Sequence, residues 1–280
     1  MASAPTVDRV FASVYDIPTD APEADGTLAW DKTTVVVVEV EAAGKRGLGY
    51  TYSAVAAAQL ATGILSEAIH GVDALAIPTA HRNMVRAVRN VGRPGLVATA
   101  ISAIDAALWD LKGKLLGQPL AALLGPVREE VPVYGSGGFT NYSERRLQEQ
   151  LTDWVEEGIR WVKMKVGSDP EADTSRVAAA RRVIGDVGLF VDANGAYSRK
   201  QALDMAACFA EHGVAYFEEP VSSDDLAGLS LVRESCPRGM QVAAGEYGYD
   251  SWAQKSRVRG LLRKDTCHET QTFSTMAMRA

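Results

Sequence analysis

Four charged residues recur at a nearly constant interval in the second half of this 280-residue chain. Lys165, Asp192, Glu218 and Glu246 are separated by 27, 26 and 28 residues (192 − 165, 218 − 192, 246 − 218). This interval is the length of one strand–helix unit with its loops, and each charged residue follows a short apolar run. In a parallel (β/α) barrel the strand ends open onto one face, which carries the active site. We therefore expect these side chains to converge as a metal site with an adjacent base.

The three acids have the chemistry of a magnesium site. Three carboxylates held close together repel one another strongly without a cation, and Mg²⁺ prefers oxygen ligands in octahedral geometry. We predict that Asp192, Glu218 and Glu246 bind Mg²⁺; the alternative is that each acid pairs with a nearby lysine or arginine. Side chains alternate along a strand, so only one glutamate of the Glu218–Glu219 pair can face the metal. We assign this role to Glu218 and a supporting role to Glu219.

The lysines are candidates for acid–base chemistry. Lys163 and Lys165 lie two residues apart on an apolar strand, so both face one side while Met164 faces the other. Two neighbouring ammonium groups depress each other's pKa, and partial burial lowers the pKa further. A lysine brought near neutrality can abstract a proton. We predict Lys165 as the base and Lys163 as a group that holds a substrate carboxylate or tunes Lys165; a solvated lysine pair is the alternative.

Asn194 follows Asp192 by two residues and is expected to face the same way. It would donate to substrate or contact the metal through a water molecule. A simple turn residue between Ala193 and Gly195 is the alternative, because Asn and Gly are common in turns.

From Val131 onward, strands and helices alternate with short loops, which predicts parallel strands. The expected helices cover residues 143–157, 171–184, 200–212 and 224–235. Five strand–helix units are recognisable, whereas a closed barrel has eight, and three more would need roughly 80 residues. Only 34 residues follow Glu246 (280 − 246), and those after Trp252 have no strand-like run. We therefore expect a chain that is truncated or frame-shifted after about Trp252.

The first 130 residues have a different pattern. The expected strands, rich in β-formers, cover residues 7–17, 33–42 and 47–53. The expected helices cover residues 54–69, 79–90 and 96–116, with a short closing helix after them. Strands followed by helices predict an α+β arrangement. The Pro/Asp/Gly-rich residues 18–30 between the first two strands are expected to form an exposed, mobile loop.

Composition and charge narrow the class of protein. The chain is 47% hydrophobic and 23% charged, which is typical of a globular protein, and its net charge is −6. A negative charge argues against nucleic acid or an anionic membrane as partner. No secretory signal or membrane-spanning run is present, and the odd, scattered cysteines are typical of reduced thiols. We expect a cytoplasmic protein; the cysteines are Cys208, Cys236 and Cys267.

The motifs KMK, VDAN, EEP and AGE on successive strands resemble those of the enolase superfamily, specifically its mandelate racemase subgroup. The segment AISAIDAALWDLKGKLLGQPLAALLG at residues 100–125 is also similar to the helix that joins capping domain and barrel in that family. The resemblance covers about residues 7–252. It implies an α/β protein: an α+β capping domain at residues 1–130, a TIM-type (β/α) barrel at 131–252, here incomplete, and an atypical tail at 253–280.

The resemblance also implies chemistry. Enzymes of this family bind Mg²⁺ through three carboxylates and abstract the proton α to a substrate carboxylate, giving an enediolate. We expect a dehydratase of acid sugars; the alternatives are a racemase, epimerase or cycloisomerase, or a non-catalytic remnant. The second base of the subgroup, a His–Asp dyad on later strands, is not identifiable in this sequence.

By the same resemblance, loops of the capping domain would close over a small carboxylate substrate. Trp30, Tyr50 and Tyr52 would then contact that substrate, although each residue could equally serve packing. We also expect a homo-oligomer.

Overall fold

The computed structural model describes residues 4–249, which divide into two compact units. The first unit comprises the residues up to Thr19 together with Lys32–Glu130. The second comprises Asp20–Asp31 and the residues from Val131 onward. Within residues 4–249, no helix combines the length and the apolar character needed to cross a membrane. The tail expected at 253–280, with any break after Trp252, lies outside the described residues.

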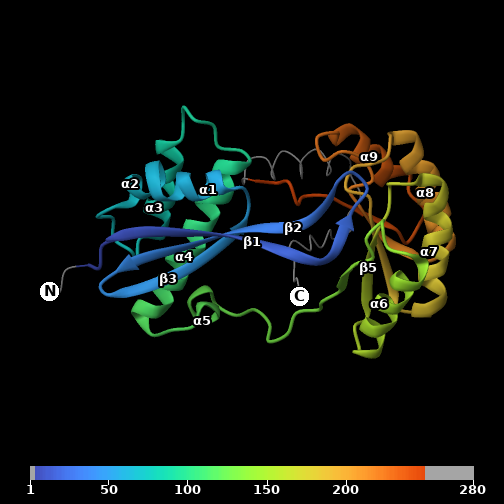
Figure 1. Ribbon diagram of the computed structural model, residues 1–280, viewed down its shortest axis with the longest axis horizontal. Helices are drawn as coiled ribbons and strands as arrows, with labels where there is room; N and C mark the ends of the chain where they lie inside the picture. Colours follow the sequence, from blue (N-terminus) through green and yellow to red (C-terminus); the bar gives the residue numbers. More distant parts are fainter. Residues whose placement is uncertain (1–3, 250–280) are drawn as a thin grey trace. The chain divides into compact units, whose positions relative to one another are not determined.

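The first unit has the predicted α+β architecture (Figure 1). Its strands are β1 (Arg9–Ala24), β2 (Ala29–Ala42) and β3 (Lys45–Tyr52), except that the ends of β1 and β2 within Asp20–Asp31 belong to the second unit. Its helices are α1 (Val55–Leu60), the π-helical turn η1 (Ala61–Leu65), α2 (Ser66–Ile69), α3 (Ile77–Ala87), α4 (Leu96–Leu116) and α5 (Leu120–Leu124). The sheet order is β1-β2-β3, with β2 and β3 antiparallel, and alternate valines of β2 pack against the helices in one core. The single helix expected at 54–69 is interrupted at Gly63, whose backbone is not helical.

The prediction of an exposed, mobile loop at residues 18–30 is wrong. β1 and β2 continue through most of this segment, and only Asp25–Leu28 lie between them as the hairpin turn. Both Pro18 and Pro22 lie on β1, an edge strand of the sheet, which is where strands tolerate proline.

The second unit is built from alternating strands and helices. Its strands are β4 (Gly135–Gly137), β5 (Trp161–Lys165), β6 (Gly188–Asp192), β7 (Val214–Glu218) and β8 (Gln241–Ala243). Its helices are α6 (Glu144–Glu156), α7 (Pro170–Ile184), α8 (Arg199–Glu211) and α9 (Leu226–Ser235). The five strands pair in chain order and all in parallel, which confirms the predicted β/α alternation.

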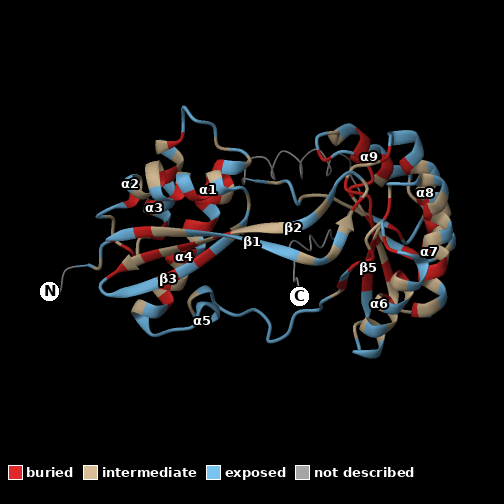
Figure 2. Ribbon diagram, viewed as in Figure 1, coloured by how far each residue is buried: buried red, intermediate tan, exposed pale blue. Residues whose placement is uncertain are grey.

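Period-two alternation in the strands separates a core face from a polar face. Val162, Met164, Val191 and Phe217 are fully buried and share one apolar cluster with residues of α6–α9. The residues between them, such as Lys163, therefore face the opposite side of the sheet. Figure 2 shows the buried residues gathered between the strands and these helices. The prediction that Met164 and the lysines face opposite sides is confirmed.

Candidate metal centre

Sheet register places the charged residues of neighbouring strands in one row. Lys165 is the register partner of Asp192, and Asp192 is the partner of Glu218. Glu218 is in turn paired with Ala243, the last residue of β8. Glu246 follows Ala243 by three residues and so lies in the loop after β8 rather than on the strand itself. The carboxyl ends of four parallel strands or their loops thus supply these side chains.

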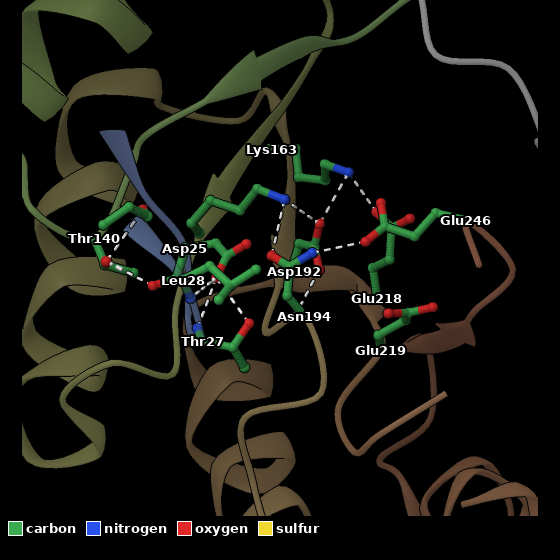
Figure 3. A network of polar contacts seen from close by, with 12 residues as sticks. Asp25, Thr27, Leu28, Thr140, Lys163, Asp192, Asn194, Glu218, Glu219 and Glu246 are labelled. Atoms are coloured by element: carbon green, nitrogen blue, oxygen red, sulfur yellow. Dashed lines mark hydrogen bonds and ion pairs between the residues drawn. The ribbon is translucent and has the colours of Figure 1, made fainter. Parts of the chain in front are cut away.

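The three acids predicted as ligands are brought together. One carboxylate oxygen from each of Asp192, Glu218 and Glu246 lies within 4.8 Å of the others. Asp192 is fully buried, whereas Glu246 is exposed. Figure 3 shows the carboxylates of Glu218 and Glu246 turned toward the same space beside Asp192. Three oxygens at this spacing fit a hard divalent cation, which takes carboxylate oxygens and fills its octahedron with water or substrate.

Both lysines contact this cluster. The Lys165 Nζ donates to Asp192 Oδ2 at 2.6 Å. The Lys163 Nζ lies 3.3 Å from the same oxygen and donates to Glu218 Oε2. Pairing of the acids with lysines was the alternative to a metal site, and it occurs at Asp192 and Glu218. Two ammonium groups beside three carboxylates nevertheless leave a surplus of negative charge. None of the ion pairs found within residues 4–249 includes Glu246.

The expectation of a depressed lysine pKa is wrong for Lys163. Burial lowers the pKa of Lys163, since only 5% of the residue is exposed, but the negative charges of Asp192 and Glu218 outweigh that effect. The net result is a raised pKa, so Lys163 stays an ammonium group beside these carboxylates. Opposite charges at contact distance therefore dominate over the repulsion between the two lysines.

Asn194 forms the turn considered as the alternative, and its side chain also contacts the charged cluster; its contact with substrate or with a water-bound metal stays a prediction. Its backbone has φ 47°, in the left-handed region that asparagine tolerates better than most residues. Its N–H donates to Asp192 Oδ1 at 3.0 Å, which closes a turn. Its side chain accepts from the Lys165 Nζ at 2.9 Å and donates to Glu246 Oε1 at 2.9 Å. Asn194 thus connects a lysine with the third carboxylate.

The two adjacent glutamates differ in their surroundings. Burial and the charge of Asp192 raise the pKa of Glu218, and the ammonium of Lys163 partly opposes this shift. Glu219 is 1% exposed, and burial, followed by the charge of Glu246, raises its pKa to about 8. Glu219 is therefore predominantly protonated at neutral pH, so it adds little charge to the cluster.

Aromatic rings that sequence reasoning missed lie beside Lys163. The Lys163 Nζ is 5.3 Å from the ring centroid of Tyr134, which meets Phe190 edge-on at 5.6 Å. Phe190 in turn lies 5.0 Å from Tyr216. The ring face of Tyr134 attracts the ammonium and holds it near the carboxylates. Alternation along β6 and β7 gives a sequence signal for Phe190 and Tyr216, whereas Tyr134 lies just before β4.

The tip of the β1–β2 hairpin packs directly against the segments that carry the site. The Thr140 hydroxyl donates to the carbonyl oxygens of Ala24 and Asp25, at 3.1 and 2.9 Å. At Gly26, an added Cβ would lie 2.4 Å from the carbonyl oxygen of Ala193 and 2.7 Å from that of Val166. These two residues directly follow Asp192 and Lys165 in the chain, so the tip lies against the backbone beside both.

Asp25 organises the turn itself. It is 8% exposed, and its Oδ1 accepts from the backbone N–H groups of Thr27 and Leu28 at 2.6 and 2.7 Å. The Thr27 hydroxyl donates to the same oxygen at 3.0 Å. Figure 3 shows this turn and Thr140 on one side of the charged cluster. A buried carboxylate with three donors fixes the shape of the tip.

The residues predicted to contact substrate have other contacts here. The Trp30 Nε1 donates to Glu23 at 2.8 Å, and the indole meets Phe139 edge-on at 5.6 Å. Tyr52 belongs to the first unit, where it meets the ring of Tyr50 edge-on at 6.2 Å and is 45% exposed. Contact of Trp30 and Tyr52 with substrate stays a prediction.

An α+β unit followed by parallel β/α units, with acids at successive strand ends, is typical of proteins that join an α+β domain to a (β/α) barrel. Residues 13–125 match the family model described as Mandelate racemase / muconate lactonizing enzyme, N-terminal domain. Residues 146–261 match the model described as Enolase C-terminal domain-like. The chain belongs to the mandelate racemase/muconate lactonizing enzyme family of the enolase superfamily, which confirms the resemblance seen in the motifs.

Named relatives in this family are enzymes. The chain is 35% identical to the 3,6-anhydro-alpha-L-galactonate cycloisomerase of Streptomyces coelicolor, over 86% of this chain and 68% of the relative. It is 33% identical to the L-talarate/galactarate dehydratase of Salmonella typhimurium, over 79% of this chain. The chain spans 59% of the length of that dehydratase.

Solved structures share the fold. A mandelate racemase/muconate lactonizing enzyme-like protein from Rubrobacter xylanophilus superposes with a TM-score of 0.88 and 52% identity, over 92% of this chain and 71% of that one. The Salmonella typhimurium dehydratase, in a structure with Mg and L-lyxarohydroxamate, has a TM-score of 0.83 and 27% identity. That match covers 92% of this chain and 69% of the other. The predicted fold class, a capping domain with a TIM-type barrel, is confirmed.

Gly26→Ala is expected to detach the hairpin tip from the rest of the second unit. The added methyl carbon would overlap two backbone carbonyl oxygens, which cannot move as a flexible side chain can. Overpacking of this kind costs about 1–3 kcal/mol. Hydrogen–deuterium exchange of residues 20–31 should therefore accelerate, and exchange that matches the wild type would contradict the packing described for the tip.

Thr140→Val is expected to act in the same direction but more weakly, because it removes one hydroxyl that donates to Ala24 and Asp25. The matched control is Thr140→Ser, which keeps the hydroxyl. Exchange of residues 20–31 should rise in the valine variant and stay near the wild-type rate in the serine variant. Equal rates in the two variants would show that the hydroxyl does not hold the tip.

Proposed function

We propose that this chain carries the magnesium site and the base of an enzyme that abstracts the proton α to the carboxylate of an acid sugar. The product of this step is an enediolate, and the most favoured overall reaction is loss of water. The observation that carries the proposal is the convergence of three carboxylates within 4.8 Å beside the Lys165 Nζ. Membership of a family whose named relatives include a galactonate cycloisomerase and a talarate/galactarate dehydratase supports acid sugars as the substrate class.

Asp192, Glu218 and Glu246 would hold the cation. Their three oxygens lie close enough together to ligate one ion, and their surplus of negative charge over the two lysines favours a divalent ion. When bound, Mg²⁺ supplies positive charge that offsets the negative charge developing on the substrate carboxylate.

Lys165 is the base in this proposal. As the neutral amine, its Nζ accepts the α-proton while the electron pair of the C–H bond moves into the carboxylate group to form the enediolate. Asp192 and Asn194 orient this nitrogen, since both contact it at hydrogen-bond distance. Lys163, whose pKa is raised, keeps its positive charge and is suited to bind the substrate carboxylate.

A second candidate reaction is cycloisomerisation. It is favoured by the cycloisomerase relative, which matches 86% of this chain. Both reactions begin with the same proton abstraction and differ in the group that leaves the carbon next to the enediolate. Dehydration expels a hydroxyl group, which departs as water, whereas a cycloisomerase changes the ring and keeps every atom. The mass of the product therefore distinguishes the two.

The proposal also includes contact of Trp30 and Tyr52 with the substrate and assembly of the protein into a homo-oligomer. A non-catalytic protein that binds Mg²⁺ but turns nothing over is the remaining alternative. The experiments below separate it from an enzyme, because binding of the cation and exchange of the α-proton are measured independently.

Titration with Mg²⁺ by calorimetry should show one site in the wild-type chain. Asp192→Asn and Glu218→Gln should each weaken binding by more than about 10-fold, because removing a ligand costs at least as much as removing a group that supports one. Asp186→Asn, an exposed acid in the loop before β6, is the matched control and should bind as the wild type does. Absence of binding by the wild-type chain would refute the magnesium site.

Lys165→Met should strongly slow α-proton exchange while leaving Mg²⁺ binding intact. With galactarate or talarate in D₂O, the wild type should incorporate deuterium at the carbon next to the carboxylate, and the variant should do so roughly 100- to 10,000-fold more slowly. Lys200→Met, at an exposed lysine of α8, serves as the control. Exchange that survives in the Lys165 variant would remove that residue from the mechanism; no exchange by the wild type with any acid sugar would favour the non-catalytic alternative.

A further inference from the structure

Glu219 adopts a backbone conformation that few residues other than glycine adopt. It directly follows Glu218 at the end of β7, and its φ is 37°, in the left-handed region. Only two other non-glycine residues within 4–249, Ala43 and Asn194, share a positive φ. Such strain persists when the surrounding structure demands it, and it gathers at functional sites.

The side chain of Glu219 is also unfavourable for the stability of the fold. It is 1% exposed, and its Oε2 is buried without a hydrogen-bond partner among the described residues. Its Oε1 accepts one long hydrogen bond, from the N–H of Gly245 at 3.4 Å. A buried polar atom left without a hydrogen-bond partner is destabilising, and an apolar side chain of similar shape would avoid that cost. Packing alone therefore does not account for a glutamate here.

The contacts of Glu219 join the two loops on either side of it. Its backbone N–H donates to the carbonyl of Ala243 at 2.8 Å, and its carbonyl accepts from the N–H of Gly195 at 2.8 Å. Gly195 follows Asn194, in the loop after Asp192. Together with the bond from Gly245, these contacts link the segments before and after β7 that carry the other two carboxylates.

Glu246 is the carboxylate that most needs such support. Asp192 lies at the end of a five-residue strand paired on both sides, whereas Glu246 is exposed and follows the three-residue strand β8. The residue before it, Gly245, has φ 146°, so this part of the loop is open to several backbone conformations. A hydrogen bond to the Gly245 N–H restricts the direction in which the next side chain leaves the backbone.

We infer that Glu219 is a positioning residue, which holds the Gly245 N–H through its carboxyl oxygen and so fixes Glu246 beside Asp192 and Glu218. This inference rests on the proposed magnesium site for its consequence, which is a higher affinity for the cation. The hydrogen bond itself exists without the cation and is open to separate measurement. Glu219 acts through the loop, not by touching substrate.

Three variants separate the parts of this role. Glu219→Gln keeps an oxygen acceptor in the same place, whereas Glu219→Met keeps the length of the side chain and removes the acceptor. Glu219→Gly removes the side chain and relieves the backbone strain, since glycine adopts a positive φ freely. It therefore provides a well-folded variant if the methionine chain packs poorly. Glu211→Met, at an exposed glutamate of α8, is the matched control.

The first readout is the exchange rate of the Gly245 amide, measured by NMR on the chain without added metal. The rate should rise at least about 10-fold in the Met and Gly variants and stay near wild type in the Gln and Glu211 variants. The second readout is Mg²⁺ affinity by calorimetry, which should fall about 10- to 100-fold in the same two variants. The thermal midpoint of the Met and Gly variants should not fall together with their Mg²⁺ affinity, because an unsatisfied buried oxygen has been removed.

Unchanged Gly245 exchange and unchanged affinity in the Met and Gly variants would overturn the inference. A Gln variant as weak as the Met variant would also overturn it, since the oxygen acceptor would then not be the cause. If the wild-type chain binds no Mg²⁺, the proposed function fails, while the exchange experiment still decides whether Glu219 holds Gly245.

Discussion

Mutual repulsion between three carboxylates is the constraint to which the rest of the second unit responds. Oxygens of Asp192, Glu218 and Glu246 lie within 4.8 Å of one another. At an effective dielectric constant of about 20, two unit charges at that distance repel by roughly 3 kcal/mol. Asp192 is fully buried and cannot spread its charge into water, so Lys163 and Lys165 must lie where they do. The two ammonium groups neutralise only part of the cluster, which is why it remains suited to a divalent cation.

Strand register gives this arrangement its precision. Lys165, Asp192 and Glu218 lie in one row across β5, β6 and β7. A slip of one residue in β6 would turn Asp192 toward the helices and place Val191 in the site. Val191 is fully buried in the cluster shared with α6–α9, so the apolar half of each strand fixes the register that the charged half requires. The core and the site therefore lie on opposite faces of the same sheet, and one pattern of alternating side chains produces both.

Because the core and the site both depend on the alternation of side chains along the strands, some features could be predicted from sequence and others could not. Alternation and spacing are local, so the parallel units, the orientation of Met164 and the meeting of the acids were all accessible. The raised pKa of Lys163 was missed, because it depends on the distance to carboxylates on other strands. The positive φ of Glu219 was equally inaccessible, since its backbone is set by hydrogen bonds to Ala243 and Gly195 in neighbouring segments. A contact between a residue and a partner in another helix, strand or loop produces no periodic pattern in the sequence, so it cannot be predicted in this way.

The tip of the β1–β2 hairpin is a second feature that could not be predicted from local sequence. Composition suggested a mobile loop at 18–30, yet the second unit holds this segment mainly through backbone atoms. Thr140 donates to two carbonyl oxygens, Asn141 donates to a third on Pro22, and Gly26 meets carbonyl oxygens with no side chain of its own. Contacts to backbone atoms survive most side-chain substitutions at the residues that supply them. The tip can therefore keep its place beside the carboxylates while its outward side chains change.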